Sequence, residues 1–319
     1  AMLDSANRDH FGLDSYKRDG FISCDLASES VSRTLEYAYD DFCIAETALA
    51  LGHEATARAF AARSQAWRHL HDPASRFFRA RRNGRWLTPF DPAQVDHNYT
   101  EANAWQYRFA VPHDPAAHMA LLGGEEAYAA ALDSMFAADS STSGRDLPDI
   151  TGRLGQYVHG NEPSHHVPYL YVYAGRPWKT QERVRRILRE MYRPAPDGLC
   201  GNDDCGQMSA WYLFSALGFY PVAPGSNQYV LGSPAVRRAE IDLGGGRSFR
   251  VVVENQAPDH VYVAGVWLDG ERLERAYVTH AEIVRGGELR FRMSDRPDRK
   301  WGTAPQARPY SMSPAGSGR

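Results

Sequence analysis

Residues 28–70 read SESVSRTLEYAYDDFCIAETALALGHEATARAFAARSQAWRHL, and this stretch decides the fold. Apolar residues recur every three or four positions between 31 and 51, which predicts an amphipathic helix. Gly52 ends that pattern, and a second helical pattern runs from 54 to 70, where an Asp-Pro pair stops it. Two helices joined by so short a turn predict a helical hairpin.

Helical patterns continue beyond this hairpin as far as residue 217. The loops between them are rich in His, Asn, Asp and Gly. Antiparallel helix pairs with polar connecting loops are typical of a helical barrel or toroid, whose loops gather at one rim. The segments predicted as helices are 101–109, 115–122, 125–137, 166–174, 180–192 and 207–217.

The pattern changes after Gly218, where short segments rich in Val, Ile, Tyr and Phe alternate with turns such as Asp-Gly and Gly-Gly. Such segments predict an antiparallel β-sandwich. The predicted strands are 228–231, 236–243, 248–254, 261–268, 275–280 and 289–293. The predicted organisation is a helical barrel over 1–222, a β-sandwich over 223–302 and a disordered tail, rich in Pro, Ser, Gly and Arg, over 303–319.

The composition excludes several classes of protein. The chain has 319 residues, 43% of them hydrophobic, and is long enough to bury a core. Its mean hydropathy is -0.51, and no apolar run approaches the ~20 residues of a membrane helix. The net charge is -3, so no basic excess would attract nucleic acid. With 7 Trp and 17 Tyr, the chain is predicted to be an enzyme or binding protein for a sugar-like or small polar ligand.

The cysteines and the first residues leave the disulfide state and the location of the protein open. The 4 cysteines match no zinc-binding spacing. Cys200 and Cys205 are the local candidates for a disulfide, and free buried thiols are an equal alternative. The opening residues, Ala-Met-Leu-Asp-Ser, have neither the basic nor the apolar segment of a signal peptide. We therefore expect either a cytoplasmic protein or a chain that begins inside a longer one.

The first of three polar clusters is NYTEANAWQY, residues 98–107. Asn98 or Thr100 is predicted to cap a helix that carries Glu101 in its first turn. One interpretation is that Glu101 only compensates the helix dipole. The other is that Trp105, one turn further on, forms an apolar wall that raises the pKa of Glu101, as a general acid requires.

The second cluster is HGNEPSHHVPY, residues 159–169. Its three His, one Asn and one Glu lie within eight residues, which is dense for a loop. One interpretation is a polar turn that caps the next helix, and the other is a metal or sugar site. The cluster lacks the pair of His at i and i+4 around a Glu that binds zinc. Asn161 and Glu162 supply the hard oxygen atoms that calcium prefers.

The third cluster is GNDDCGQMSAWY, residues 201–212. Asp203 and Asp204 precede a predicted helix and have glycines on both sides. An N-cap needs only one Asp. The second carboxylate is then available as a general base or as a ligand of a metal or a hydroxyl group. The run is too short, and lacks the Glu, for an EF-hand loop.

Together the clusters place carboxylates at 101, 162 and 203–204, each at a junction of loop and helix. A helical toroid would gather such junctions at one mouth. Two carboxylates that face each other across a sugar perform glycoside hydrolysis. No Gly-x-Ser-x-Gly, P-loop or Gly-x-Gly-x-x-Gly motif supports serine or nucleotide chemistry.

At these clusters the chain resembles glycoside hydrolase family 92, the calcium-dependent exo-acting α-mannosidases. The resemblance runs from about residue 10 to Trp301 and includes SRTLEYAYDD at 32–41, PFDP at 89–92 and GRPW at 175–178. It implies an inverting hydrolase on an (α/α)6 barrel followed by a β-sandwich. The implied substrate is a mannose-containing oligosaccharide or glycan that loses its terminal α-linked mannose, as in N-glycan processing.

The resemblance also implies roles for individual residues. Inversion requires roughly 6.5–9.5 Å between the two carboxyl groups, with water between them. Calcium would bind the 2- and 3-hydroxyls of mannose. Asn202 stands where some family members carry an acid. The implied general acid is Glu101, the base Asp204 with Asp203 beside it, the calcium ligands Asn161 and Glu162 with the carbonyl of Ala104 or Trp105 as a weaker candidate, and the sugar contacts Trp86, Trp105, His165 and His166.

Full family members begin with a large β-sandwich that supplies part of the sugar pocket. The resemblance therefore implies an incomplete barrel here, with an N-terminal β-sandwich domain or subunit as partner. Family members are usually exported, so a secreted or periplasmic location is expected. The alternatives are a non-catalytic carbohydrate-binding fragment, another glycosidase on a helical toroid, or a polysaccharide lyase, which the carboxylate-rich loops disfavour.

Overall fold

The computed structural model describes residues 1–313. The chain forms two compact units. Unit 1 comprises Ala1–His113 with Ser134–Ser164, and unit 2 comprises Asp114–Asp133 with the described part of His165–Arg319. None of the helices in residues 1–313 has both the length and the apolar character needed to cross a lipid bilayer. All four cysteines are free thiols, so the Cys200–Cys205 disulfide is absent from the described structure.

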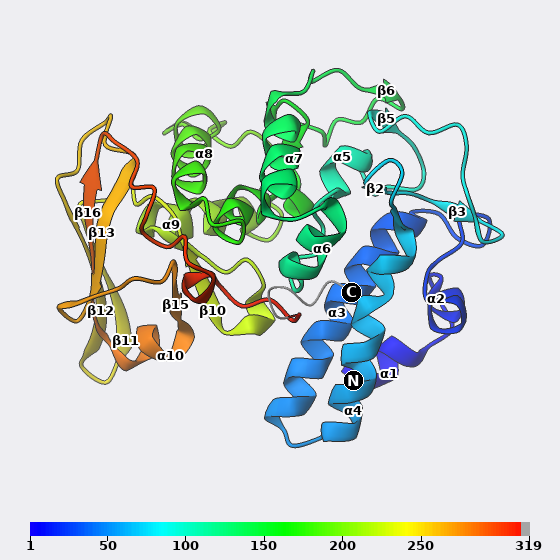
Figure 1. The fold of residues 1–319 in the computed structure, drawn as a ribbon, viewed down its shortest axis with the longest axis horizontal. Coiled ribbons are helices and arrows are strands. Elements are labelled where there is room, and N and C mark those ends of the chain that lie inside the picture. Colours follow the sequence, from blue (N-terminus) through cyan, green and yellow to red (C-terminus); the bar gives the residue numbers. More distant parts are fainter. Residues whose placement is uncertain (314–319) are drawn as a thin grey trace. The chain divides into compact units, whose positions relative to one another are not determined.

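The helical hairpin predicted from residues 28–70 is confirmed as the frame of unit 1 (Figure 1). Helix α3 (Ser30–Ala50) packs along α4 (Glu54–Arg63), and Ile44, Ala45 and Phe60 form a buried cluster between them. The second helix tightens into the 3-10 helix η1 (Ser64–Leu70). Ser64 Oγ donates to the Ala61 carbonyl at 2.8 Å, and this bond competes with the regular helical pattern.

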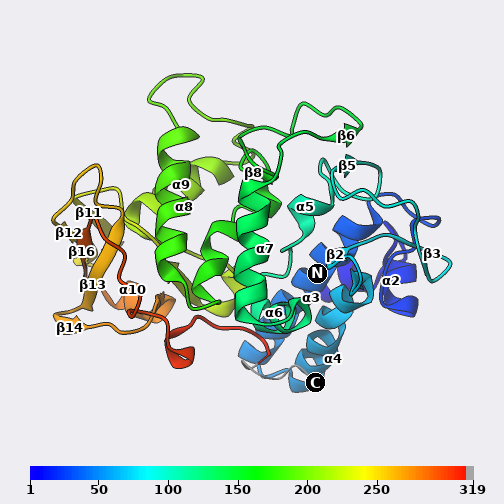
Figure 2. The ribbon, with the colours of Figure 1, turned by 45° about the horizontal axis from the view of Figure 1, so that its top comes forward.

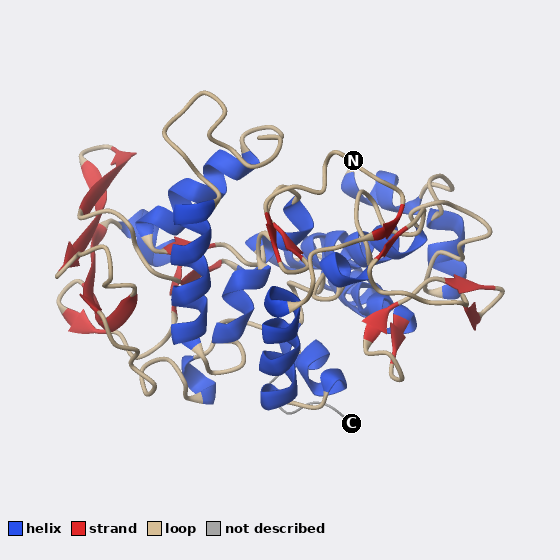
Figure 3. Cartoon of the chain, turned by 90° about the horizontal axis from the view of Figure 1, so that it is seen from above, coloured by secondary structure: helices blue, strands red, loops and turns tan. Residues whose placement is uncertain are grey.

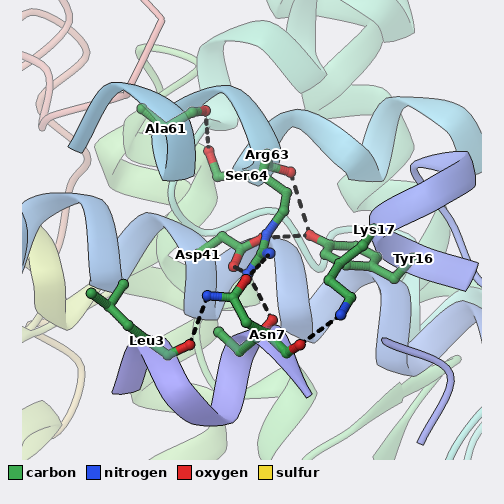
Figure 4. A network of polar contacts seen from close by, with 9 residues as sticks. Leu3, Asn7, Tyr16, Lys17, Asp41, Ala61, Arg63 and Ser64 are labelled. Carbon is green, nitrogen blue, oxygen red and sulfur yellow. Dashed lines mark hydrogen bonds and ion pairs between the residues drawn. The ribbon is translucent and has the colours of Figure 1, made fainter. Parts of the chain in front are cut away.

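A partly buried ion pair joins the two helices to the short helix α2 (Leu13–Asp19) (Figure 4). Arg63 donates to both oxygens of Asp41, at 2.6 and 2.7 Å. Tyr16 Oη donates to the same carboxylate at 2.8 Å. Burial raises the pKa of Asp41, and the contacts with Arg63 and Tyr16 act in the opposite direction. A bidentate pair of this kind fixes the relative orientation of three helices.

The rest of unit 1 is made of short paired strands and loops. Strand β5 (Gln94–Val95) runs parallel to β6 (Ser143–Gly144), which joins two loops that are distant in sequence. Val95, Ile150 and Val158 form a small core beneath them. The remaining elements are α1 (Met2–Asn7), the antiparallel pairs β1 (His71–Asp72) with β2 (Phe77–Phe78), β3 (Arg81–Arg82) with β4 (Arg85–Trp86) and β7 (Arg153–Leu154) with β8 (Tyr157–Val158), and the helical turns α5 (Ala104–Tyr107) and η2 (Glu162–Ser164).

The buried carboxylate of Asp72 makes unit 1 sensitive to acid. Burial by itself raises its pKa, but contacts with Ser75, the Arg79 guanidinium at 2.8 Å and backbone amides outweigh burial and lower the pKa to about 2. A carboxylate with a lowered pKa stabilises the fold above its unfolded pKa of about 3.9 and loses that effect as the pH falls toward 2.

Asp72→Asn is expected to lower the free energy of unfolding at pH 7 by about 2 kcal/mol. Urea titrations at pH 7, 4 and 2.5 measure this, with the exposed Asp146→Asn as control. An Asp72→Asn protein with unchanged stability and an unchanged response to acid would contradict the assignment.

Unit 2 begins with helices. Helix α8 (Pro177–Glu190) lies beside α9 (Gln207–Leu217) (Figure 2). On another face α8 contacts a strand: Gln181 Oε1 accepts from the backbone of Val263 at 3.1 Å, and Tyr262 Oη donates to Glu182 at 2.5 Å. The other helical elements are α6 (Pro115–Leu122), α7 (Glu125–Ala137, within this unit to Asp133), η3 (Val167–Val172), η4 (Pro224–Ser226) and η5 (Pro305–Ala307).

Two sheets complete unit 2, and Figure 3 draws their strands in red. The larger has the order β11-β12-β16-β13-β14, and the smaller the order β15-β10-β9. One pair, β12 with β16, is parallel, so the expectation of a fully antiparallel arrangement is wrong there. A helical connection, α10 (His280–Arg285), precedes β16 and allows it to run in the same direction as β12. The strands are β9 (Phe219–Tyr220), β10 (Gln228–Leu231), β11 (Arg238–Gly244), β12 (Arg247–Glu254), β13 (Tyr262–Leu268), β14 (Glu271–Arg272), β15 (Tyr277–Thr279) and β16 (Gly287–Ser294).

The predicted disordered tail is wrong for residues 303–313, and residues 314–319 lie outside the described structure. Ala307 accepts from the backbone of Ala276 at 2.9 Å. Asp114, the N-cap of α6, accepts from Ser313 Oγ at 2.7 Å and from Ser311 Oγ at 2.9 Å. The polar residues that made the tail look disordered are those that complete the cap of a helix. The boundaries at 222 and 302, the barrel and the sandwich stay predictions.

Candidate active site

Glu101 lies in a loop and not in a helix. The cap of α5 is Asn103, whose side chain accepts from the amides of Trp105 and Gln106, and Gln106 Oε1 accepts from the Asn103 amide in return. The predicted cap, Asn98 or Thr100, is therefore wrong. Because Glu101 precedes the helix, the interpretation that it compensates a helix dipole loses its basis. The side chain is exposed, and the backbone has a φ of 49°.

The surrounding contacts hold this loop in place. The Thr100 amide donates to Ser32 Oγ at 2.8 Å, and Tyr99 Oη donates to the Phe78 carbonyl at 2.7 Å. On the other side, Asn103 Nδ2 donates to Gln156 Oε1 at 3.0 Å. A left-handed conformation is unfavourable for a residue with a side chain and persists only where neighbours enforce it, which is common at functional sites.

The second cluster contacts the first within unit 1. Asn161 Nδ2 donates to the Glu101 carbonyl at 2.9 Å, so the predicted metal ligand and the predicted acid share one loop junction. Glu162 follows in η2 and is partly exposed. Within residues 1–313, no group of three or more His, Cys, Asp or Glu could hold a metal ion. An amide oxygen, one carboxylate, a backbone carbonyl and water are a donor set that suits calcium and does not suit zinc.

Glu36 of α3 belongs to the same region, and sequence reasoning gave it no role. It accepts a hydrogen bond from Tyr107 Oη at 2.9 Å. Its side chain keeps exposed surface, but protein surrounds it on most sides, and burial raises its pKa. The bond from Tyr107 lowers the pKa, while the charges of Asp40, Glu29 and Glu162 raise it further. In the sequence, the one feature that could have pointed to Glu36 is its position in SRTLEYAYDD, between the buried Leu35 and Ala38 of α3.

Glu101 also lines a pocket of about 350 Å³ in unit 1. This volume lies in the range of about 300–1,000 Å³ that small-ligand sites occupy. The residues that line it are Ser28, Glu29, His97, Tyr99, Glu101, Arg145, Leu147 and Asp149.

The predicted aromatic sugar contacts, Trp86 and Trp105, are not among the residues that line this pocket in the described structure. The Arg81 guanidinium lies 4.8 Å from the Trp86 ring centre. Trp105 makes an edge contact with Phe77, with ring centres 4.9 Å apart, and Arg108 lies 5.2 Å from its ring. A sugar would therefore have to use the parts of these rings that the arginines and Phe77 leave open.

In unit 2 the structure distinguishes the two adjacent aspartates. Asp203 accepts from the amide and the Oγ of Ser209, both at 2.9 Å, and so satisfies the start of α9. Asp204 is exposed, has a φ of 40°, and its carboxylate has no hydrogen-bond partner among the described residues. Cys205 and Gly206 continue the left-handed conformation, with φ of 57° and 85°. The carboxylate of Asp204 is thus the one that remains available for chemistry.

The histidine pair packs near α9. His165 is buried, its carbonyl accepts from Trp211 Nε1 at 2.9 Å, and its Nδ1 lies 3.2 Å from Gln207 Nε2. Gln207 is the first residue of α9, so His165 is linked to the end of the aspartate loop. His166 is buried at the start of η3.

Comparison with known proteins gives consistent results. Residues 1–295 match the model of the glycosyl hydrolase family 92 catalytic domain. An alpha-mannosidase of this family from Bacteroides thetaiotaomicron, solved in complex with mannoimidazole, is 39% identical, with a TM-score of 0.95 over 98% of this chain and 42% of that one.

Two further relatives are similar over most of this chain. The inverting mannosidase of the same family from Bacteroides thetaiotaomicron VPI-5482 is 35% identical, with a TM-score of 0.89 over 98% of this chain and 45% of that one. An uncharacterized secreted glycosidase of Arthroderma benhamiae is 28% identical over 94% of this chain and 41% of its own length. The chain thus spans about two fifths of the length of these relatives.

Proposed function

Because the chain belongs to glycosyl hydrolase family 92, we propose that it is an α-mannosidase that releases terminal α-linked mannose from glycans with inversion. One relative was solved in complex with mannoimidazole and another is described as an inverting mannosidase, and both support this chemistry. The same proposal includes N-glycans as substrates and an (α/α)6 barrel followed by a β-sandwich as the fold. It also includes an N-terminal β-sandwich domain or subunit as partner. The relative that is called secreted supports an exported protein.

Glu101 is the proposed general acid. It would protonate the glycosidic oxygen as the bond to the leaving group breaks. Its exposed carboxylate, its position outside the helix and the contacts that fix its loop support this role. A carboxylate held in a loop by its neighbours can keep one orientation toward the leaving oxygen.

Asp204 is the proposed general base, which would take a proton from the attacking water. Asp203 is better suited to positioning, because both of its oxygens are engaged by Ser209. The observation that carries the proposal is the shared geometry of Glu101 and Asp204. Each is an exposed carboxylate in a left-handed backbone, two or three residues before a helix.

Mannose release from an aryl α-mannoside tests the function, with the anomer of the first product followed by NMR. The β-anomer is expected first. A folded protein that neither cleaves nor binds α-mannosides would refute the proposal. The second candidate is a non-catalytic mannose-binding protein. Calorimetry with mannose and calcium distinguishes it, because binding without release of mannose supports that candidate.

Asn161 and Glu162 are the proposed calcium ligands, with a carbonyl of Ala104 or Trp105 as a further candidate. When bound, the ion would hold two hydroxyl groups of the sugar and help to distort its ring. Asn161 would supply its amide oxygen, since its Nδ2 is bonded to Glu101. His165, His166, Trp86 and Trp105 remain the proposed sugar contacts.

Calcium is expected to raise the melting temperature of the protein. A ligand at 100 times its Kd stabilises a protein by about 2.7 kcal/mol, and chelation should reverse the shift. Asn161→Ala and Glu162→Gln should abolish the calcium-dependent shift, while Glu54→Gln on the surface of α4 should keep it. Differential scanning fluorimetry with and without calcium gives the answer independently of catalysis. A full shift in both ligand variants would exclude these residues as the site.

A further inference from the structure

The role of Glu101 indicates which part of the substrate the pocket around it binds. A general acid donates its proton to the oxygen of the leaving group, so the side chains around that acid face the leaving group. If Glu101 is the acid, as proposed above, the pocket that it lines in unit 1 holds the group that departs from mannose. This inference therefore rests on the proposed function and adds the identity of the leaving group.

The charges that line this pocket disfavour an anion. Three carboxylates, those of Glu29, Glu101 and Asp149, line it with one guanidinium, that of Arg145. Glu29 is paired with Arg33 at 2.7 Å, outside the lining. Glu101 carries a proton when it acts as the acid, so Asp149 and Arg145 balance each other and the lining offers no surplus cation to bind an anion. A neutral, hydroxyl-rich group fits this lining better than a phosphate or a carboxylate.

Backbone pairing holds Arg145 at the pocket. The amide of Arg145 donates to the Val95 carbonyl at 3.0 Å, directly after the parallel pair β5 and β6. A Cβ on Gly144 would lie 2.4 Å from that same carbonyl, so only glycine allows the approach. His97 stands two residues beyond Val95, and its Nδ1 lies 3.4 Å from Arg145 Nη1. The pairing thus brings an arginine and a histidine to one wall.

We propose that Arg145, oriented by His97, selects a neutral sugar as the leaving group by donating hydrogen bonds to its hydroxyl groups. Arginine carries five N–H donors in a fixed planar arrangement, which suits two adjacent hydroxyls. It is a specificity residue, and the sugar from which mannose is removed is its ligand.

Two substrates separate this role from catalysis. The leaving group of an α-linked dimannoside is a sugar, whereas that of α-mannosyl fluoride is a fluoride ion. Arg145→Ala is expected to lower kcat/KM for the dimannoside about 10–100-fold, because a charged hydrogen bond to the substrate is lost, and to change it less than about twofold for the fluoride. Arg145→Lys keeps the charge without the planar donors and should recover only part of the loss. Arg58→Ala, an exposed arginine on α4, is the matched control and should behave as the parent.

Each outcome decides between the inference and the function on which it rests. A parent that cleaves both substrates, with Arg145→Ala slowing both equally or neither, overturns the role of Arg145 and leaves the proposed function intact. A parent that prefers a mannose phosphodiester to the dimannoside overturns the neutral leaving group. A parent that only binds is tested by calorimetry, where Arg145→Ala should weaken the dimannoside about tenfold and leave methyl α-mannoside unchanged. A folded parent that neither binds nor cleaves refutes both proposals.

Discussion

Glu101→Gln is expected to lower kcat about 10²–10⁴-fold on a mannoside whose leaving group is a sugar. Glutamine has the shape of glutamate but cannot give a proton to the glycosidic oxygen. The loop should remain folded, because Thr100, Tyr99 and Asn103 supply hydrogen bonds that fix it and that the substitution leaves in place. Steady-state kinetics measure the loss, and circular dichroism confirms that the variant is folded.

The leaving group distinguishes a general acid from a residue that only binds substrate. The leaving group of a dinitrophenyl mannoside, dinitrophenolate, departs without protonation. Glu101→Gln should therefore retain most of its activity on this substrate. The alkaline limb of the pH–rate profile, which reports deprotonation of the acid, should also disappear. An equal loss on both substrates would contradict the assignment.

Asp204→Asn is expected to lower kcat about 10²–10⁴-fold on every mannoside, because an amide cannot take the proton of the attacking water. Azide needs no deprotonation, so it should restore turnover and give the mannosyl azide of inverted configuration. Asp269→Asn is the matched control, since Asp269 is a second aspartate with a left-handed backbone, at φ 53°. A failure of azide to rescue a folded Asp204→Asn protein would argue against the base role.

The neighbouring aspartate provides the sharper comparison. Asp203 is bonded to the amide and the hydroxyl of Ser209, so Asp203→Ala should cost about 0.5–2 kcal/mol of stability, as the loss of a helix cap does. Asp203→Asn keeps one acceptor and should lose less stability and much less activity than Asp204→Asn. If Asp203→Asn abolished turnover without any change in stability, the base would have to be reassigned to Asp203.

The hairpin of unit 1 could be predicted from sequence because its signals are local. The period of its apolar residues sets the buried face, and Gly52 ends the first helix with a φ of 77°. What failed was the choice among similar caps. Asn98, Thr100 and Asn103 are all good N-caps, and the selection of Asn103 depends on Gln106 and on Gln156, which lies 53 positions away.

In the candidate site, too, local features could be predicted from sequence and features that depend on distant contacts could not. Carboxylates at junctions of loop and helix are visible in the sequence, and so are motifs such as HGNEPSHH. The difference between Asp203 and Asp204 is not, because it depends on which carboxylate turns back to Ser209. Glu36 and Arg145 were missed for a related reason. One lies on a helix that the sequence explains by packing alone, and the other reaches its pocket through a pairing of two short strands distant in the chain.

The last described residues have a practical consequence for anyone who shortens the gene for crystallisation. By composition, a stop codon at 303 would remove only a flexible extension. It would in fact delete the two serine hydroxyls that complete the cap of α6 at Asp114 and the Ala307 carbonyl that accepts from Ala276. A shortened gene should therefore keep every residue through Ser313, and any C-terminal purification tag must be encoded between Ser313 and the stop codon.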